Sequence, residues 1–325
     1  MSNDSAATAD NAAAKQFVRP DFPVRSSASS KRWQAVVVVG LIACSMISLL
    51  TTVGIILMLV FESSGFFADD QIDIWEFLTG TRWTIGQSQG QMYYGIWPLL
   101  SGTLRITGIA MLIALPMGLI TAIYLSEYAT KRVRSILKPV LEILAGIPTV
   151  VLGFFAVKFI TPYLLQPFAD FKTFNATSAG IAVGILCLPL VTSLAEDALQ
   201  AVPRKLREGA YGLGSTRLEV TLKVVLPAAL SGIISAFLLA LARAIGETMV
   251  VALAAGSTPT YTLDPRVPSQ TMTGFIVETF KSESVVPGTL SYYSIYAVAA
   301  VLFILTFLIT LIGQIIRMRY REVYD

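Results

Sequence analysis

The stretch EGAYGLGSTRLEVTLKVVLP, Glu208 to Pro227, is a polar segment marked by turn residues between two long apolar runs. Leu199 to Tyr211, which overlaps its start, carries apolar residues near helical spacing among charged ones, and this predicts a short amphipathic helix on a polar surface. Gly212 and Gly214 are expected to end that helix, because glycine accepts the left-handed conformation that helix ends need. A rigid helix held beyond a bilayer can be gripped by another protein. The alternative interpretation is a solvated connection that lies on lipid headgroups.

The composition indicates a polytopic membrane protein. Of 325 residues, 54% are hydrophobic and only 14% are charged, which is too apolar for an ordinary soluble domain. A helix that crosses a bilayer needs roughly 20 apolar residues. Six runs approach or exceed this length, and the fourth is the shortest: Trp33 to Phe61, Pro98 to Leu125, Ile136 to Ile160, Ser178 to Leu194, Val224 to Ala255 and Ser291 to Ile316. The sequence therefore predicts an all-α fold with six transmembrane helices.

Lysine and arginine residues are concentrated in alternate connections, and this pattern indicates the orientation of the spans. They lie in the amino-terminal tail, the second-to-third and fourth-to-fifth connections, and the carboxyl-terminal tail. Because short cytoplasmic loops hold an excess of these residues, both termini are expected to be cytoplasmic. The first apolar run is too long for a cleaved signal peptide. The tail before it, rich in Ala, Ser, Asn and Asp, is expected to be disordered.

Several kinds of chemistry are absent from the sequence. The chain has no histidine, which excludes Ser-His and Cys-His nucleophile pairs and the usual zinc sites. It also has no Gly-x-x-x-x-Gly-Lys-Ser/Thr phosphate-binding loop, so any ATP that drives it must be hydrolysed by another polypeptide. Cys44 and Cys187 both lie in predicted spans, where cysteine serves as a small apolar packing residue, and no disulfide is expected. The chain is therefore predicted to bind no metal and no cofactor itself.

Two ionisable residues lie deep in the fifth apolar run, and such residues are expensive in a bilayer and mark pathways or paired contacts. Arg243 and Glu247 are four residues apart, so on one helix they would share a face and could pair. One interpretation is a structural ion pair that locks two helices. The other is that Arg243 faces a path and attracts an anion, because its planar guanidinium can bond two oxygens of a tetrahedral oxyanion. Arg105 and Lys158 lie near span ends, where extension toward the headgroups explains them, and Arg105 is also a candidate for the outer vestibule.

Three segments carry a resemblance to a known family. Glu208-Gly209-Ala210, three residues, Gly214, nine residues and then Val224-x-Leu226-Pro227 resembles the cytoplasmic loop of bacterial ATP-binding-cassette (ABC) import permeases, with Gly209 for Ala and Val224 for Ile. ARAIGETM, Ala242 to Met249, resembles the fifth-span signature of the phosphate-specific importer's permeases, the PstC type more than the PstA type. AGIPTVVLGFFA, Ala145 to Ala156, is similar to the same family, and the likeness extends from about Trp97 through the last span.

The resemblance implies the transmembrane permease of an ATP-driven phosphate importer with type I ABC importer architecture, forming half of the translocation path. It implies a PstA-like permease, a dimer of PstB-like ATPase subunits that binds ATP and Mg²⁺, and a PstS-like extracytoplasmic phosphate-binding protein as partners, besides membrane lipid and with no nucleic acid. Arg243 and Glu247 would serve phosphate passage, and Glu208, Gly209, Ala210 and Gly214 would dock the ATPase. The expected organisation is a disordered cytoplasmic tail (1–32), a first transmembrane helix (33–61), an extracytoplasmic segment (62–97), a permease core (98–316) with its coupling loop near 199–223, and a cytoplasmic tail (317–325).

Three alternatives remain at this point. The permease could carry another oxyanion. A secondary transporter driven by protons or sodium is disfavoured, because Glu247 is the only deeply embedded acid and already has a potential arginine partner. A membrane-bound hydrolase is suggested only by Gly86-Gln87-Ser88-Gln89-Gly90, and without histidine or a strand-turn-helix context that match is accidental.

Overall fold

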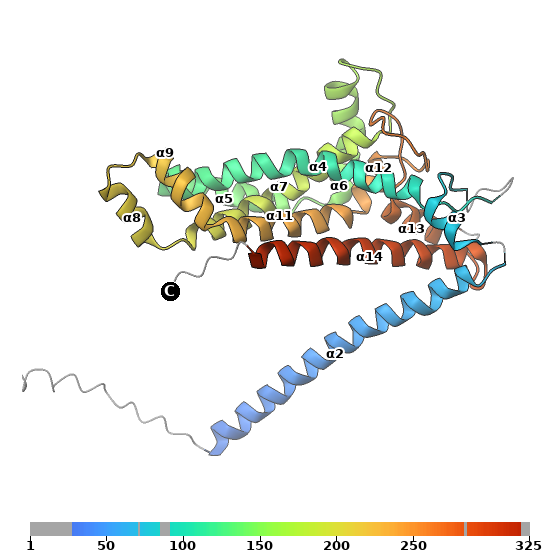
Figure 1. Ribbon diagram of the computed structural model, residues 1–325, viewed down its shortest axis with the longest axis horizontal. Helices are drawn as coiled ribbons and strands as arrows, with labels where there is room; N and C mark the ends of the chain where they lie inside the picture. The colour runs from blue at the N-terminus through green and yellow to red at the C-terminus, as the bar shows by residue number, and fades with distance from the viewer. Residues whose placement is uncertain (1–27, 71, 85–91, 283–284, 320–325) are drawn as a thin grey trace, which may run out of the picture. The chain divides into compact units, whose positions relative to one another are not determined.

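A computed structural model describes residues 28–70, 72–84, 92–282 and 285–319 of the chain (Figure 1). Within these ranges the regular structure is helical, apart from one isolated antiparallel β-bridge between Trp83 and Tyr94. The elements labelled α are α-helices and those labelled η are π-helices: α2 (Ala28–Phe67), α3 (Ile74–Thr79), α4 (Trp97–Ile123), η1 (Tyr124–Tyr128), α5 (Lys131–Ala145), α6 (Thr149–Phe155), η2 (Ala156–Leu165), α7 (Ala176–Gln200), α8 (Arg204–Gly212), α9 (Arg217–Val220), η3 (Thr221–Val225), α10 (Leu226–Ala228), α11 (Leu230–Ile245), α12 (Met249–Ala254), α13 (Met272–Lys281) and α14 (Leu290–Arg319). The predicted all-α fold class is confirmed.

The chain divides into two compact units, one up to Leu57 and one from Met58 onward. The described part of the first unit belongs to α2, whose apolar side chains are exposed all around the helix. Such a helix is typical of a membrane span. Most of the predicted tails lies outside the described residues, namely 1–27 at the amino end and 320–325 at the carboxyl end, and so does the Gly-x-Ser-x-Gly match at 86–90.

Four continuous helices are long and apolar enough to cross a membrane: Trp33–Phe67, Trp97–Tyr128, Ala176–Gln200 and Leu290–Arg319. Two further helix pairs qualify when each is taken as one bent span, Lys131–Ala145 with Thr149–Leu165 and Arg217–Ala228 with Leu230–Ile245. The described residues therefore hold four spans, or up to six, and the six predicted apolar runs fall on these helices.

The runs that were predicted as the third and fifth spans are not straight helices. The third bends by 88° where α5 ends at Ala145, with Gly146 as its C-cap, and Pro148 precedes α6. Proline fixes its own backbone and lacks an N–H group, so Pro148 favours the end of one helix and the start of the next. The fifth bends by 69° at Ala229, between α10 and α11, and breaks again at Gly246 before α12.

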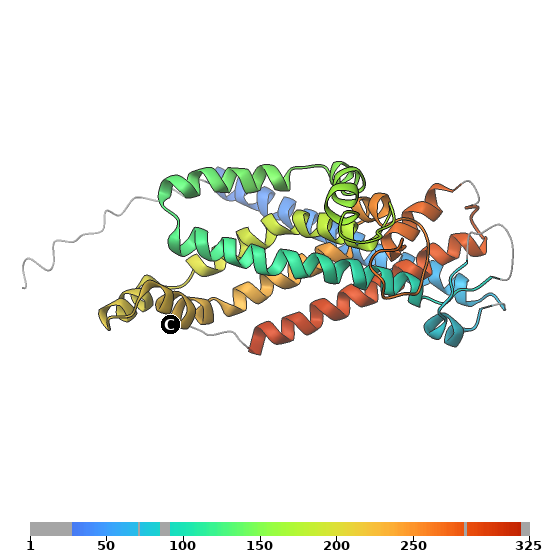
Figure 2. The same ribbon diagram turned by 90° about the horizontal axis from the view of Figure 1, so that it is seen from above.

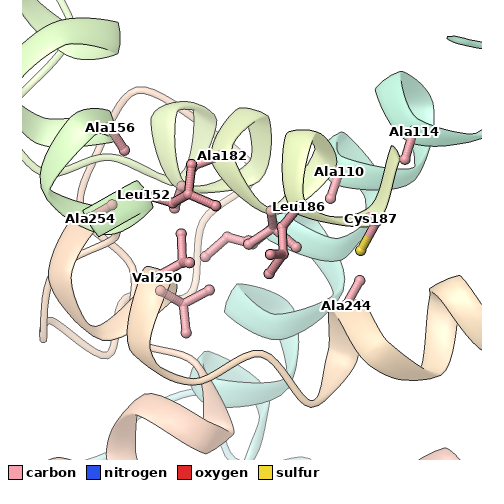
Figure 3. Packing of buried hydrophobic residues seen from close by; sticks show 14 of the residues in the cluster. Ala110, Ala114, Leu152, Ala156, Ala182, Leu186, Cys187, Ala244, Val250 and Ala254 are labelled. Carbon is pink, nitrogen blue, oxygen red and sulfur yellow. The ribbon is translucent and has the colours of Figure 1, made fainter. Parts of the chain in front are cut away.

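The core lies where α4, α7 and α11 pack against one another, with α6 and α12 beside them (Figures 1 and 2). Small residues dominate the contact, including Ala110 on α4, Cys187 on α7 and Ala244 on α11, and Figure 3 shows their side chains gathered between these helices. Close approach depends on glycine at Gly118, for example, because a Cβ there would lie 2.8 Å from the Cβ of Val191. Small residues at a helix interface permit this separation in a membrane.

A second cluster of buried residues lies at the α3 end of the bundle. Phe66, Phe77 and Trp83 meet edge to face, and Trp83 also meets Phe275 of α13 with ring centroids 5.0 Å apart. Edge-to-face pairs of this kind add to the energy of simple burial. The segment between the first two spans therefore contains the short helix α3 and an aromatic cluster that holds it against α13.

The opposite end of the bundle carries α8 and α9 (Figures 1 and 2). The predicted amphipathic helix forms, but it starts at Arg204 and not at Leu199, because α7 continues to Gln200 and Pro203 then separates the two helices. After α8, Gly214 has φ +83°, the left-handed conformation that glycine adopts without strain. Thr216 then caps α9 with a complete capping box to Glu219.

Candidate functional site

A cavity of about 800 Å³ lies between α5, α7 and α11. It is mostly apolar in its lining, with five charged side chains. The residues that line it are Lys138, Leu141, Glu142 and Ala145 of α5, Leu186, Pro189, Leu190, Ser193 and Glu196 of α7, Leu239, Ala242 and Arg243 of α11, and Gly246 and Glu247 just beyond α11. The fold thus brings both predicted pathway residues, Arg243 and Glu247, to the wall of one cavity.

Arg243 lies in the last turn of α11, and its side chain is exposed in the cavity. Among the described residues, no carboxylate lies within 4.0 Å of its guanidinium, and no side chain or carbonyl accepts a hydrogen bond from it. A cation with this environment keeps all its donors available. It can therefore bind an anion that enters the cavity, and a planar guanidinium suits a tetrahedral oxyanion in particular.

Glu247 does not share a continuous helix with Arg243, contrary to the expectation from their spacing. The α-helix α11 ends at Ile245, and Glu247 lies in the break before α12. Its Oε1 accepts a hydrogen bond of 3.3 Å from the amide of Val250, and its carbonyl accepts one of 2.8 Å from the hydroxyl of Thr273. The carboxylate therefore satisfies the first turn of α12, where a negative charge is favourable, and the predicted contact with Arg243 is not made.

Glu196 is a charged residue of the cavity wall that the sequence did not reveal. Its carboxylate is almost completely buried. Oε1 lies 2.5 Å from Nη2 of Arg134 and accepts a hydrogen bond of 2.8 Å from the side-chain amide of Gln200, and Oε2 lies 3.5 Å from Nζ of Lys138. The predicted fourth span stopped at Leu194, which assigned Glu196 to a solvated connection. One signal was available, because Arg134 and Lys138 are four residues apart and present two cations on one face of α5.

Glu142 also lines the cavity and follows Lys138 by one turn of α5. Its side chain is exposed. With Lys138 and Glu196 paired to each other, the charged side chains of the wall that remain open to the cavity are Arg243 and Glu142.

The predicted coupling residues lie apart from the cavity, on and after α8. Glu208 and Gly209 are exposed, Ala210 is half-buried, and Gly214 provides the turn toward α9. A Cβ on Gly209 would meet nothing within 4 Å, so this face of α8 is open. The α8 helix is attached to the bundle through Arg207, which lies 3.1 Å from the carboxylate of Glu127, another buried acid that the sequence did not reveal.

Arg105 does not extend to lipid headgroups, as its position near a span end suggested. Its Nη1 donates hydrogen bonds of 2.7 Å to the carbonyls of Thr262 and Asp264, and its other guanidinium nitrogens are buried. It therefore anchors the connection between α12 and α13 and does not offer a free charge. Lys158, in contrast, is exposed on η2 and lies outside the cavity wall.

A bundle of helices long and apolar enough to cross a membrane, with charged side chains around a cavity, is typical of a membrane transport protein. No cluster of three or more His, Cys, Asp or Glu side chains in the described ranges could hold a metal ion. The description "binding-protein-dependent transport system inner membrane component" belongs to a protein family whose model matches residues 114–322. The chain belongs to this family, and it is a multi-pass membrane protein.

Individual relatives agree with this assignment. The chain is 32% identical over 271 residues to the probable ABC transporter permease protein YqgH of Bacillus subtilis, covering 83% of this chain and 86% of that protein. It is 34% identical over 262 residues to the phosphate transport system permease protein PstC of Mesorhizobium japonicum, covering 75% and 78%. Among solved structures, a bacterial ABC transporter of alginate in complex with its periplasmic protein matches with a TM-score of 0.62 at 16% identity, covering 91% of this chain and 99% of that one, which shows the shared fold.

Proposed function

We propose that the chain is a transmembrane subunit of an ATP-driven importer of inorganic phosphate, and that it forms half of the translocation path. The observation that carries the proposal is the free guanidinium of Arg243 in the wall of a cavity of about 800 Å³. The relative in Mesorhizobium japonicum is a phosphate transport system permease, and the family description names a binding-protein-dependent system. An arginine is suited to phosphate because it stays charged at cellular pH and offers a fork of donors.

Within this proposal, the second half of the path is a PstA-like permease, and a PstS-like binding protein delivers phosphate from outside. Both termini and the α8–α9 loop lie in the cytoplasm, where a dimer of PstB-like subunits binds ATP and Mg²⁺. Glu208, Gly209, Ala210 and Gly214 present the loop to these subunits, and the exposed face of α8 around Gly209 supports this role. ATP shifts the assembled importer between two arrangements, because the ATPase subunits bind ATP more tightly in one arrangement than in the other.

Glu247 holds the backbone after α11 in this proposal and does not neutralise Arg243. Its hydrogen bond to Val250 fixes the first turn of α12, directly after the break that follows the helix of Arg243. A permease must also release its cargo, and the open carboxylate of Glu142 in the same cavity limits how firmly an anion is held.

The test is uptake of radiolabelled phosphate by cells that lack other phosphate importers and carry the Arg243→Gln variant. We expect at least a tenfold loss, because hydrogen bonds to a charged group contribute about 1.5–3 kcal/mol. Lys158→Gln is the matched control, since it removes an exposed cation that does not line the cavity. Equal uptake by Arg243→Gln and the control, at equal amounts of assembled complex, would refute the role of Arg243.

The choice of anion is tested by competition with unlabelled oxyanions, which separates phosphate from another tetrahedral substrate. An ion-coupled mechanism is tested in the same cells by collapsing the membrane potential without depleting ATP. The proposal requires uptake that survives this treatment and stops when ATP is depleted.

A further inference from the structure

Glu127 lies at a junction between the bundle and the α8–α9 loop. Its carboxylate Oε1 is 3.1 Å from Nη2 of Arg207 on α8 and 2.9 Å from the hydroxyl of Ser126. Its backbone carbonyl accepts a hydrogen bond from Arg217, the first residue of α9, and the guanidinium of Arg217 also lies 4.9 Å from the ring centroid of Tyr128. The single residue Glu127 therefore receives one arginine from each helix of the loop.

The carbonyl of Glu127 is available because the helix ends there. The last carbonyls of a helix have no partner within it, and a cation at this end is favoured by the helix dipole. Arg217 supplies both the donor and the charge. The position of α9 is thus tied to the end of η1 by the backbone as well as by a side chain.

Arg207 is the side chain that fixes the position of α8 relative to the bundle. None of the α8 residues is buried, although Leu206 and Ala210 pack partly against neighbouring apolar residues. Among the described residues, Arg207 is the one α8 side chain with a hydrogen bond or ion pair beyond the loop, to Glu127 and to the carbonyl of Leu199 at 2.6 Å. Apolar contacts permit sliding, whereas a charged hydrogen bond defines a position.

The helix that ends at Glu127 reaches the other end of the bundle. The α4 and η1 segments run without a break from Trp97 to Tyr128, a length of about 48 Å at 1.5 Å per residue. Near the start, Arg105 binds two carbonyls of the α12–α13 connection, and the hydroxyl of Thr103 accepts a hydrogen bond of 3.0 Å from the amide of Met272. One continuous helical element is therefore bonded to a loop at each end.

We propose that Glu127 is a positioning residue that transmits displacement of the α8–α9 loop to α4, and through Arg105 to the connection between α12 and α13. This inference rests on the proposed function, because it assigns the loop to contact with the ATPase. Without the Glu127 junction, ATP hydrolysis would move α8 and α9 while α4 stays in place. The expected defect is loss of coupling, with assembly preserved.

The experiment measures phosphate transported per ATP hydrolysed by the complete four-component importer in liposomes. Glu127→Gln keeps the shape of the side chain and removes its charge, and Arg207→Gln removes the partner. We expect the ratio to fall at least about fivefold in each, with unchanged co-purification of the ATPase. The double variant should match Arg207→Gln, because Glu127→Gln removes only the ion pair with Arg207, which Arg207→Gln already removes together with the bond to the Leu199 carbonyl. Asp197→Asn is the matched control, since Asp197 is an exposed acid near the carboxyl-terminal end of α7, the helix that precedes α8.

If Glu127→Gln transports as much phosphate per ATP as the wild type, the inference is overturned. It is also overturned if the double variant loses the product of the two single-variant losses, because the two residues would then act independently. A purely structural role would lower the amount of assembled complex and leave the ratio unchanged. If Glu127→Gln does not assemble, the ratio measured for Arg207→Gln decides alone. The failure of this inference is distinct from failure of the proposed function, which is measured by uptake in Arg243→Gln.

Discussion

The guanidinium of Arg134 lies 2.5 Å from a carboxylate oxygen of Glu196, a residue with only 1% of its surface exposed. Lys138 approaches the second oxygen at 3.5 Å. Both cations belong to α5, a helix without any buried residue, so this ion cluster is the main polar attachment of α5 to α7. The cluster also forms part of the wall of the cavity that contains Arg243.

Replacement of Glu196 by alanine should destabilise the protein by about 1–3 kcal/mol. Removing one partner of a buried ion pair leaves the others uncompensated, but Arg134 and Lys138 are each more than a third exposed and water can solvate them, which reduces the cost. Thermal unfolding in detergent would measure the change. Asp197→Asn, at an exposed position on the same helix, should unfold with the wild-type midpoint, and an equal midpoint for both variants would contradict the prediction.

A lysine at position 243 should retain part of the uptake that glutamine abolishes. Lysine preserves the charge in the cavity, but it is a point charge without the planar fork of arginine. We expect uptake by Arg243→Lys to lie between the wild type and Arg243→Gln, with a higher half-saturation concentration for phosphate. Indistinguishable uptake by the lysine and glutamine variants would show that the geometry of the donors, and not the charge alone, is required.

Alanine at Gly118 should destabilise the bundle, whereas alanine at Gly108 of the same helix should not. The new Cβ at Gly118 would lie 2.6 Å from Cγ1 of Val191, and overpacking of this kind costs about 1–3 kcal/mol. A Cβ at Gly108 would meet nothing within 4 Å, and the higher helix propensity of alanine favours it by up to about 1 kcal/mol. Unfolding midpoints of the two variants in one detergent would test this contrast, and equal midpoints would argue against close packing of α4 on α7.

The connection between α12 and α13 should keep its structure as the pH falls from 8 to 5. Hydrogen bonds from the side chain and amide of Arg266 lower the pKa of Asp264 from 3.8 to about 2. A lowered pKa means that the stabilisation is present above pH 3.8 and is lost as the pH falls through about 2. Hydrogen exchange of residues 262–268, corrected for intrinsic rates, should therefore show equal protection at pH 5 and pH 8.

The variant Asp264→Asn should show weaker protection of the same residues at both pH values. Asp70→Asn provides the control, because Asp70 is exposed and makes no hydrogen bond in the described structure. Protection in the wild type that falls markedly between pH 8 and pH 5 would contradict the low pKa of Asp264.

The features that could be predicted from the sequence are those that depend on local pattern. Apolar runs identified the membrane helices, and the charge pattern and glycines around Glu208 to Gly214 identified α8 and its end. The position of Arg243 in a hydrophobic run correctly singled it out as a side chain that needs an explanation, and it lines the cavity. Its role in transport stays a prediction.

The features that escaped prediction depend on contacts between distant segments or on a break within a predicted helix. Glu127 and Glu196 sit at the ends of apolar runs, where an acid is ordinarily solvated, and only the packed bundle supplies Arg207 and Arg134 as their partners. Helical spacing placed Glu247 beside Arg243, but the chain breaks at Gly246 and the carboxylate instead binds the amide of Val250. Tertiary contacts decided the case of the two buried acids, and a local helix break decided the case of Glu247.

The complete burial of Cys187 has a practical consequence for spectroscopy. The chain contains two cysteines, and Cys187 is sealed among apolar side chains while Cys44 lies on a helix suited to lipid. Polar maleimides do not enter hydrocarbon or a closely packed core, so both native thiols should resist them. A fluorophore or spin label attached to a cysteine introduced at Gly209 could therefore report the movement of α8 without prior removal of the native cysteines.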